Sequence, residues 1–145
     1  MNNKEYLDLV NAGEYPQEQL VPLDEPYIDK RGMIQNIIPT ISIITSKAGT
    51  ERSNHWHKND HHYLYVISGS MEYYERPAPV DGEAFDIVFN EIAYKPLIVK
   101  AGQMVFTPPM KLHKTVFLED TVLLSCSKLP RDHEHHEADV IRAKF

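Results

Sequence analysis

The sequence has few of the features that mark exported, membrane-embedded or disulfide-linked proteins. Its one cysteine, Cys126, excludes an internal disulfide framework and is typical of a reducing compartment. No stretch approaches the roughly 18 uninterrupted apolar residues that a membrane helix needs. The N-terminal residues also lack the pattern of a secretory signal. We therefore expect a cytoplasmic protein.

Basic residues are scarce as well. The chain has 15 Lys and Arg against 21 Asp and Glu, which gives a formal net charge of −6. An acidic chain lacks the basic surface of a general nucleic-acid binder, so we expect a small-molecule substrate and no nucleic-acid or membrane partner. At 145 residues, the chain is long enough for one domain with one sizeable core.

Short β-type runs fill most of the chain from Ile34 onward. They are rich in Ile, Val, Thr, Tyr and Phe, and Gly, Pro, Asn and Asp separate them. Because no helical pattern lies between these runs, we expect an all-β fold, an antiparallel sandwich or barrel. Ser68-Gly69-Ser70 is the expected turn of a hairpin between YLYVI and MEYYE.

The two ends of the chain differ from this β-rich middle, although all three segments are expected to form a single domain. Residues 1–32 predict a helix over 3–12 and an extended, proline-containing arm, and residues 33–130 predict the barrel. The tail, residues 131–145, is expected to begin as a solvated charged loop, RDHEHHE, and to end in a short helix, ADVIRAKF. A second metal site in the His/Glu cluster at 132–137 is the alternative, but no strand geometry would fix those side chains.

Histidine is unusually frequent: the chain has 8, and four of them lie between His55 and His62. His55 and His57 are separated by one residue, so on a strand both imidazoles point to the same face and form half of a metal site. His61 and His62 are adjacent and point to opposite faces, so only one of them can join the pair. His113 follows a proline-ended strand far downstream, and a closed β-barrel could bring it to the same place.

The segments around these histidines resemble the two conserved motifs of the cupin superfamily. The first motif is Gly-x5-His-x-His-x3–4-Glu-x6-Gly, and the second is Gly-x5-Pro-x-Gly-x2-His-x3-Asn. The residues that match are Gly49, His55, His57 and Gly69 in the first motif and Gly102, Pro108 and His113 in the second. Three positions depart from the motifs: His62 replaces the usual Glu, Met110 the usual Gly and Phe117 the usual Asn.

The cupin resemblance implies a jelly-roll β-barrel that holds one divalent transition metal, Zn, Fe or Ni, near its mouth. The implied ligands are His55, His57 and His113, with His62 as the fourth in place of a carboxylate. The six-residue run to Gly69 favours His62 over His61. Four neutral ligands would leave the charge of the ion uncompensated and make it a stronger Lewis acid. A cupin that has lost its metal and keeps hydrogen-bonded barrel histidines is the alternative.

Two stretches also resemble sugar-modifying cupins. Asp29-Lys30-Arg31-Gly32 is similar to the Asp-x-Arg-Gly of cupin-type sugar-nucleotide epimerases and isomerases. The run from Gly49 to His57 is similar to the Gly-x-x-Arg-x-x-His-x-His of capsular-polysaccharide cupins. The resemblance implies an epimerase or isomerase for a sugar-like or other small polar substrate. The alternatives are a non-haem metal-dependent dioxygenase, a lyase, and a non-catalytic ligand-binding module.

Epimerisation beside a carbonyl needs a base and a proton donor on the opposite face. The candidate phenols are Tyr63, Tyr65, Tyr73 and Tyr74. If His62 faces inward, Tyr63 and Tyr65 face outward, and core or sheet packing is the alternative role for all four. Trp56 lies between two implied ligands and is expected to project outward. Together with the long arm and the edge strands, it favours a homodimer.

Overall fold

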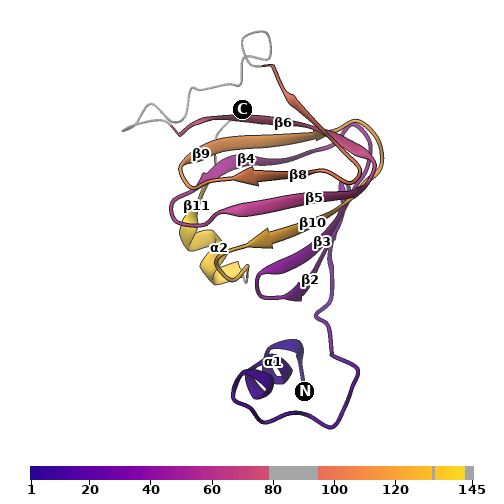
Figure 1. Cartoon of the computed structure of the whole chain (residues 1–145), viewed down its shortest axis with the longest axis vertical. Helices are drawn as coiled ribbons and strands as arrows, with labels where there is room; N and C mark the ends of the chain where they lie inside the picture. Colours follow the sequence, from indigo (N-terminus) through magenta and orange to yellow (C-terminus); the bar gives the residue numbers. More distant parts are fainter. Residues whose placement is uncertain (79–94, 132, 143–145) are drawn as a thin grey trace.

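The computed structural model describes residues 1–78, 95–131 and 133–142. Two antiparallel sheets pack face to face (Figure 1). Sheet A has the strand order β1-β2-β3-β10-β5-β8, and sheet B has the order β11-β4-β9-β6-β7. The all-β prediction is therefore confirmed, whereas no strand pairing among the described residues closes the two sheets into one barrel.

The chain passes repeatedly between the sheets, so segments far apart in the sequence become neighbours. Sheet A consists of β1 (Tyr27–Asp29), β2 (Gly32–Ile38), β3 (Ile41–Ser46), β5 (His62–Ser68), β8 (Met104–Thr107) and β10 (Thr121–Ser127). Sheet B consists of β4 (Glu51–His57), β6 (Ser70–Pro77), β7 (Leu97–Lys100), β9 (Lys111–Phe117) and β11 (Val140–Arg142). The described helices are α1 (Asn3–Asn11) and α2 (His133–Asp139).

Alternation along β5 shows how the sheets pack. Leu64 and Val66 point inward, whereas Tyr63 and Tyr65 are exposed on the outer face of sheet A. The inward side chains join a core between the sheets, which consists of Ile44, Leu64, Val66, Met71, Tyr73, Val99, Val105, Phe117 and Leu123. Phe117, at the usual cupin Asn position, is therefore a packing residue.

The expected hairpin between YLYVI and MEYYE is wrong: the turn at Gly69 joins β5 to β6, but these strands lie in different sheets and pair with other strands. The φ angle of Gly69 is +90°, and a Cβ atom there would lie 2.4 Å from Oγ1 of Thr121. Only glycine combines that backbone conformation with so close an approach. The glycine that ends the first motif is thus required by the contact of this turn with β10.

The predicted N-terminal helix is confirmed. Helix α1 begins after Asn2, whose side chain accepts a hydrogen bond from the Glu5 amide. The end of the expected arm, however, forms β1, and β2 begins at Gly32, so sheet A starts before residue 33. No helix in the described parts of the chain is long and apolar enough to cross a membrane.

The prediction for the C-terminal tail is wrong. Residues 133–137, expected in a charged loop, lie in α2, and Val140–Arg142, expected in a helix, form β11, which pairs with β4. Residues 143–145, the end of the expected helix, lie outside the described residues. Val140 lies opposite His57 and Ile141 opposite Trp56. A segment this short has little helical stability of its own, so pairing with a neighbouring strand determines its structure.

The expectation that Trp56 projects outward from the protein is also wrong. Its side chain points away from the neighbouring histidines but is only 3% exposed. It packs with Tyr74 and Leu112 in a second apolar cluster, against which Ile141 of β11 is placed. Because Trp56 is buried by residues of its own chain, it does not support a homodimer.

Candidate metal centre

Three of the implied ligands meet at one end of the sandwich. His55 and His57 lie on β4, and His113 lies on β9 directly opposite His55. One ligating atom of each of the three side chains lies within 4.8 Å of the others. The pairing of β4 with β9 therefore joins the first motif to the second.

A bulge in β4 positions His55. The residues before it, Ser53 and Asn54, have φ angles of +76° and +60°, and the register against β9 shifts between Ser53 and His55. Left-handed backbone at non-glycine residues is unfavourable, and bulges of this kind redirect side chains next to functional sites. The shift places His55 opposite His113, a feature that the sequence pattern did not indicate.

His62 lies beside His57, outside the group formed by His55, His57 and His113. The ring centroids of His57 and His62 are 4.4 Å apart, and His62 forms a second potential ligand group with His57 and Asp60. His61 lies elsewhere: its ring is 5.4 Å from that of Phe106, which is exposed on the outer face of sheet A. Of the two adjacent histidines, His62 is thus the one near the candidate centre.

Asp60, which sequence reasoning missed, orients His62. Its Oδ2 lies 2.9 Å from Nε2 of His62, and its Oδ1 accepts hydrogen bonds from the amides of Lys128 and Leu129. Burial opposes ionisation of Asp60, but the hydrogen bonds from His62 and Leu129 hold its pKa at about 2. We therefore assign the proton of His62 to Nε2, which leaves Nδ1 as the ligating atom. An acidic residue just before the His-His pair was the available signal, since ligating histidines commonly donate to a carboxylate.

His57 and His113 also present a free nitrogen. Nδ1 of His113 lies 2.9 Å from the carbonyl oxygen of Lys111, so its Nε2 remains available. His57 is 2% exposed, and its Nδ1 lies 3.4 Å from Oδ2 of Asp139, too poorly aligned for a hydrogen bond. Within the described residues neither ring nitrogen of His57 has a hydrogen-bond partner. Buried polar atoms are seldom left without a partner, and a bound metal ion would supply a partner for one ring nitrogen of His57.

Burial keeps these imidazoles neutral. Loss of solvation lowers the pKa of His57 to about 2 and the pKa of His113 to about 4, and it lowers the pKa of His55 well below its ordinary value. The pKa of His62 is lowered as well, because burial outweighs its bond to Asp60. Neutral imidazole is the form that binds metal ions, so the cluster is in its ligating form at neutral pH.

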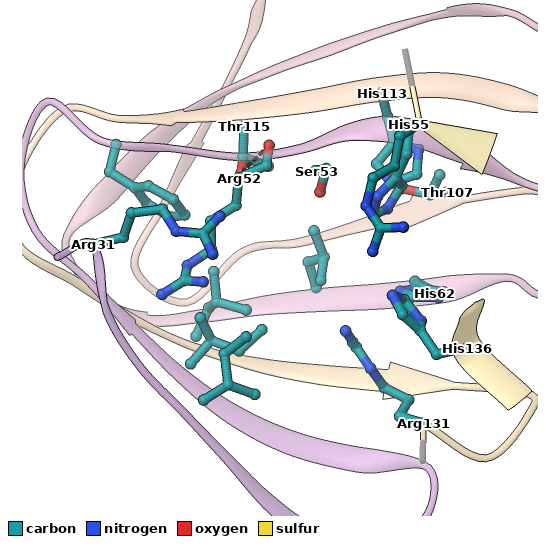
Figure 2. A pocket seen from close by; sticks show the side chains of 16 residues that line it. Arg31, Arg52, Ser53, His55, His62, Thr107, His113, Thr115, Arg131 and His136 are labelled. Atoms are coloured by element: carbon teal, nitrogen blue, oxygen red, sulfur yellow. Dashed lines mark hydrogen bonds between the residues drawn. The ribbon is translucent and has the colours of Figure 1, made fainter. Parts of the chain in front are cut away.

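Three of these histidines, His55, His62 and His113, line one end of a cavity of about 240 Å³ between the sheets (Figure 2). His136 of α2 faces the same space, with its ring centroid 5.6 Å from that of His57, and burial lowers the pKa of His136 to about 4. The expectation of a solvated loop at 132–137 is therefore wrong for this residue. Four arginines also line the cavity: Arg31, Arg52, Arg131 and Arg142.

None of the four candidate tyrosines is among the described residues that line the cavity. Tyr63 and Tyr65 are exposed on the outer face of sheet A, and Tyr74 packs with Trp56 in the second cluster. Tyr73 is the nearest: its hydroxyl lies 2.6 Å from Oγ1 of Thr107, a lining residue. Burial raises the pKa of Tyr73 above its ordinary value, so its phenol stays protonated.

Comparison with known proteins finds structural relatives only. No family model matches the chain, and no curated protein matches its sequence. The capsular polysaccharide assembling protein CapF from Staphylococcus aureus matches with a TM-score of 0.70 and 21% identity, over 98% of this chain and 42% of CapF. This chain thus spans less than half the length of CapF.

Two smaller proteins match over most of their own length. QdtA, a sugar 3,4-ketoisomerase from Thermoanaerobacterium thermosaccharolyticum in complex with TDP, has a TM-score of 0.54 and 19% identity over 81% of this chain and 82% of QdtA. KdgF from Halomonas sp. has a TM-score of 0.52 and 18% identity over 77% of this chain and 91% of KdgF. The chain therefore has the cupin fold that its two motifs predict, similar to the folds of CapF, QdtA and KdgF.

Proposed function

We propose that this chain is a metal-dependent cupin enzyme that isomerises or epimerises a sugar-like substrate. The observation that carries the proposal is the convergence of neutral histidines at one end of the cavity between the sheets. The likeness to CapF and to the ketoisomerase QdtA supports a sugar-like substrate. In this proposal the sandwich corresponds to the cupin jelly roll.

The proposed metal ligands are His55, His57 and His113, with His62 as the fourth through Nδ1. Imidazole donors suit Zn, Fe and Ni, and Asp60 and the Lys111 carbonyl hold two of the rings in the required orientation. When bound, such an ion supplies Lewis acidity toward a carbonyl or hydroxyl oxygen of the substrate.

His136 is the proposed proton carrier. Its ring faces the cavity and belongs to neither potential ligand group. Burial, together with the nearby charge of Arg131, keeps it neutral, so it can accept a proton at a ring nitrogen. Among the tyrosines, Tyr73 is the one placed to contribute, through its hydrogen bond to Thr107.

The test combines metal analysis with a proton-exchange assay. Protein purified without a metal-affinity tag should contain about one transition metal ion per chain. It should also exchange a proton next to the carbonyl of a keto sugar for solvent deuterium, with a keto sugar acid, a keto sugar phosphate and a 4-keto sugar nucleotide tested in turn, and EDTA should abolish the exchange. Full metal occupancy without exchange would contradict the isomerase proposal. Oxygen consumption by iron-loaded protein would instead favour the dioxygenase.

We further propose a homodimer that buries the outer face of sheet A. Tyr63, Tyr65 and Ile67 on β5 and Met104 and Phe106 on β8 are all at least 39% exposed there. Contiguous exposed apolar side chains are typical of association surfaces. The N-terminal arm exposes further apolar side chains, Leu20 among them, which supports a role in pairing.

A further inference from the structure

The cavity is cationic although the chain is acidic. Of the 16 residues that line it, four are arginines and four are histidines (Figure 2). No aspartate or glutamate is among these lining residues, within the part of the chain that the structure describes. The cavity therefore offers a positively charged environment to whatever enters it.

Two of the four arginines have carboxylate partners. Nε and Nη2 of Arg31 lie 2.9 Å and 2.6 Å from Oδ2 of Asp29. Both terminal nitrogens of Arg142 bond the carboxylate of Glu137, at 2.8 Å and 2.7 Å. These pairs compensate the charges of Arg31 and Arg142.

Arg52 and Arg131 are held by neutral acceptors instead. Arg52 is 7% exposed and donates from Nε to Oγ of Ser46 at 2.7 Å and from Nη2 to the Thr45 carbonyl at 3.2 Å. Arg131 donates from Nη1 to Oγ of Ser125 at 2.5 Å. Ser46 on β3 and Ser125 on β10 are fully or almost fully buried. Buried hydroxyls thus fix both guanidinium groups in place without neutralising them.

Neither arginine has a salt bridge to a carboxylate among the described residues. The carboxylates that act on them electrostatically, Asp29 on Arg52 and Asp60 on Arg131, are already bonded to Arg31 and His62 respectively. Burying a guanidinium without a counter-ion costs stability, and a bound oxyanion recovers that cost through charge-assisted hydrogen bonds.

We propose that Arg52 and Arg131 bind an oxyanion, a carboxylate or a phosphate, that is part of a monosaccharide-sized substrate. Figure 2 shows Arg31 and Arg52 at the end of the cavity away from the histidines, with Arg131 reaching in between. The anionic group would lie toward the arginines and the reacting part of the sugar toward the histidines.

The size of the cavity limits the size of the ligand. Its volume of about 240 Å³ is below the roughly 300–1,000 Å³ of pockets for drug-sized ligands, which favours a sugar acid or sugar phosphate over a whole sugar nucleotide inside the cavity. The inference rests on the proposed function for the sugar-like substrate, but the anion site itself does not require the metal.

Calorimetric titration of the full-length protein with glucuronate, glucose 1-phosphate, TDP and glucose tests the proposal. Glucuronate differs from glucose only by a carboxylate in place of a hydroxymethyl group, so their affinity ratio measures recognition of the charge. We expect at least one of the two sugar anions to bind about 10-fold or more tightly than glucose. The anion that binds identifies the source of the charge, and tighter binding of TDP than of either sugar anion would overturn the monosaccharide assignment.

Matched variants locate the site. Arg52→Gln and Arg131→Gln should each weaken anion binding by about 10- to 100-fold. Lys100→Gln, which removes the same charge from an exposed position on β7, should leave it unchanged. Because each glutamine variant removes an uncompensated buried charge, its ligand-free Tm should be equal to or above that of the wild type. Arg52→Lys, which keeps the charge but loses the planar fork, should bind with intermediate affinity.

Two results would overturn the inference. One is glucose binding as tightly as both sugar anions, and the other is wild-type anion affinity in both glutamine variants. Repeating the titrations after EDTA treatment separates this inference from the proposed function. Anion binding that persists without metal, in a protein that shows no deuterium exchange, supports the anion site and contradicts only the isomerase. Binding that is lost on EDTA treatment and unchanged in both variants assigns the anion to the metal and overturns the arginine site.

Discussion

His55 and His113 lie directly opposite each other on β4 and β9, with ring centroids 4.8 Å apart and nearly perpendicular planes. The register shift between Ser53 and His55 produces this pairing. The pairing of these two histidines therefore depends on one strand pair and its bulge, whereas the apolar core between the sheets contains no histidine. Loss of a ligand should consequently affect metal binding far more than folding.

Replacing His57 or His113 by alanine should remove the bound metal and leave the sandwich folded. Each side chain supplies one of the three converging nitrogens, while the apolar core is unchanged. After EDTA treatment, the free energy of unfolding of each variant should stay within about 2 kcal/mol of the wild type. Elemental analysis and urea unfolding measure the two quantities. Full metal stoichiometry in both variants would disprove the ligand assignment.

His62→Glu should keep the metal bound, because a carboxylate oxygen serves the same metals at a similar distance. The added negative charge should reduce the Lewis acidity of the ion, so the rate of proton exchange should fall or its pH profile move to higher pH. His62→Ala should weaken metal binding, and His61→Ala, on the outer face beside Phe106, should have little effect. Loss of metal in His61→Ala together with retention in His62→Ala would contradict the placement of His62.

Metal-free protein should lose stability as the pH falls below about 6.5, the ordinary pKa of histidine. His113 and His136 have folded-state pKa values of about 4, so between these pH values the unfolded state binds protons that the folded state excludes. One histidine kept neutral in the folded state lowers the free energy of unfolding by about 1.4 kcal/mol between pH 7.5 and 5.5. The total decrease in the free energy of unfolding should therefore be at least that large. Asp60, with a pKa of about 2, adds to the loss only below about pH 4.

Urea unfolding of EDTA-treated protein at the two pH values measures this fall. A His113→Asn variant is the matched control, because it lacks one of the histidines held neutral and should show a smaller decrease. Equal stability at both pH values would indicate that these histidines take up protons in the folded protein as readily as in the unfolded chain, contrary to the prediction.

Met110→Gly should stabilise the protein by about 0.5–1 kcal/mol. Met110 occupies the usual cupin Gly position with a φ of +60°, a conformation that costs a non-glycine residue about 1–2 kcal/mol. Part of the gain is offset because glycine loses more conformational entropy on folding. The side chain is about half exposed, so little burial is lost. Met110→Ala keeps the unfavourable backbone and should show no gain, and equal stability of the two variants would exclude backbone strain as the cause.

Ile67→Glu should convert the proposed homodimer to a monomer, because it places a charge on the exposed apolar face of sheet A. Ile98→Glu makes the same change at an exposed position on β7 of sheet B and should leave the dimer intact. Analytical ultracentrifugation at micromolar concentration gives the mass of each. A wild-type mass equal to one chain would contradict the homodimer.

Local patterns were sufficient for much of the fold. The alternation of β5, the turn at Gly69 and the shared face of His55 and His57 follow from the period of a strand and from the conformational freedom of glycine. The tail was mispredicted because β11 depends on pairing with β4, a contact made across most of the chain.

The sequence by itself determined the all-β class, the cupin motifs and the histidines of the candidate centre, because these depend on residue type and short spacings. Only the tertiary structure decided that Asp60 orients His62, that His136 faces the cavity and that Trp56 is buried. It also decided that Arg52 and Arg131 lack a carboxylate partner among the described residues. The physical reason is that burial, hydrogen-bond partners and charge compensation are set by contacts between strands from distant parts of the chain, and no local pattern encodes those contacts.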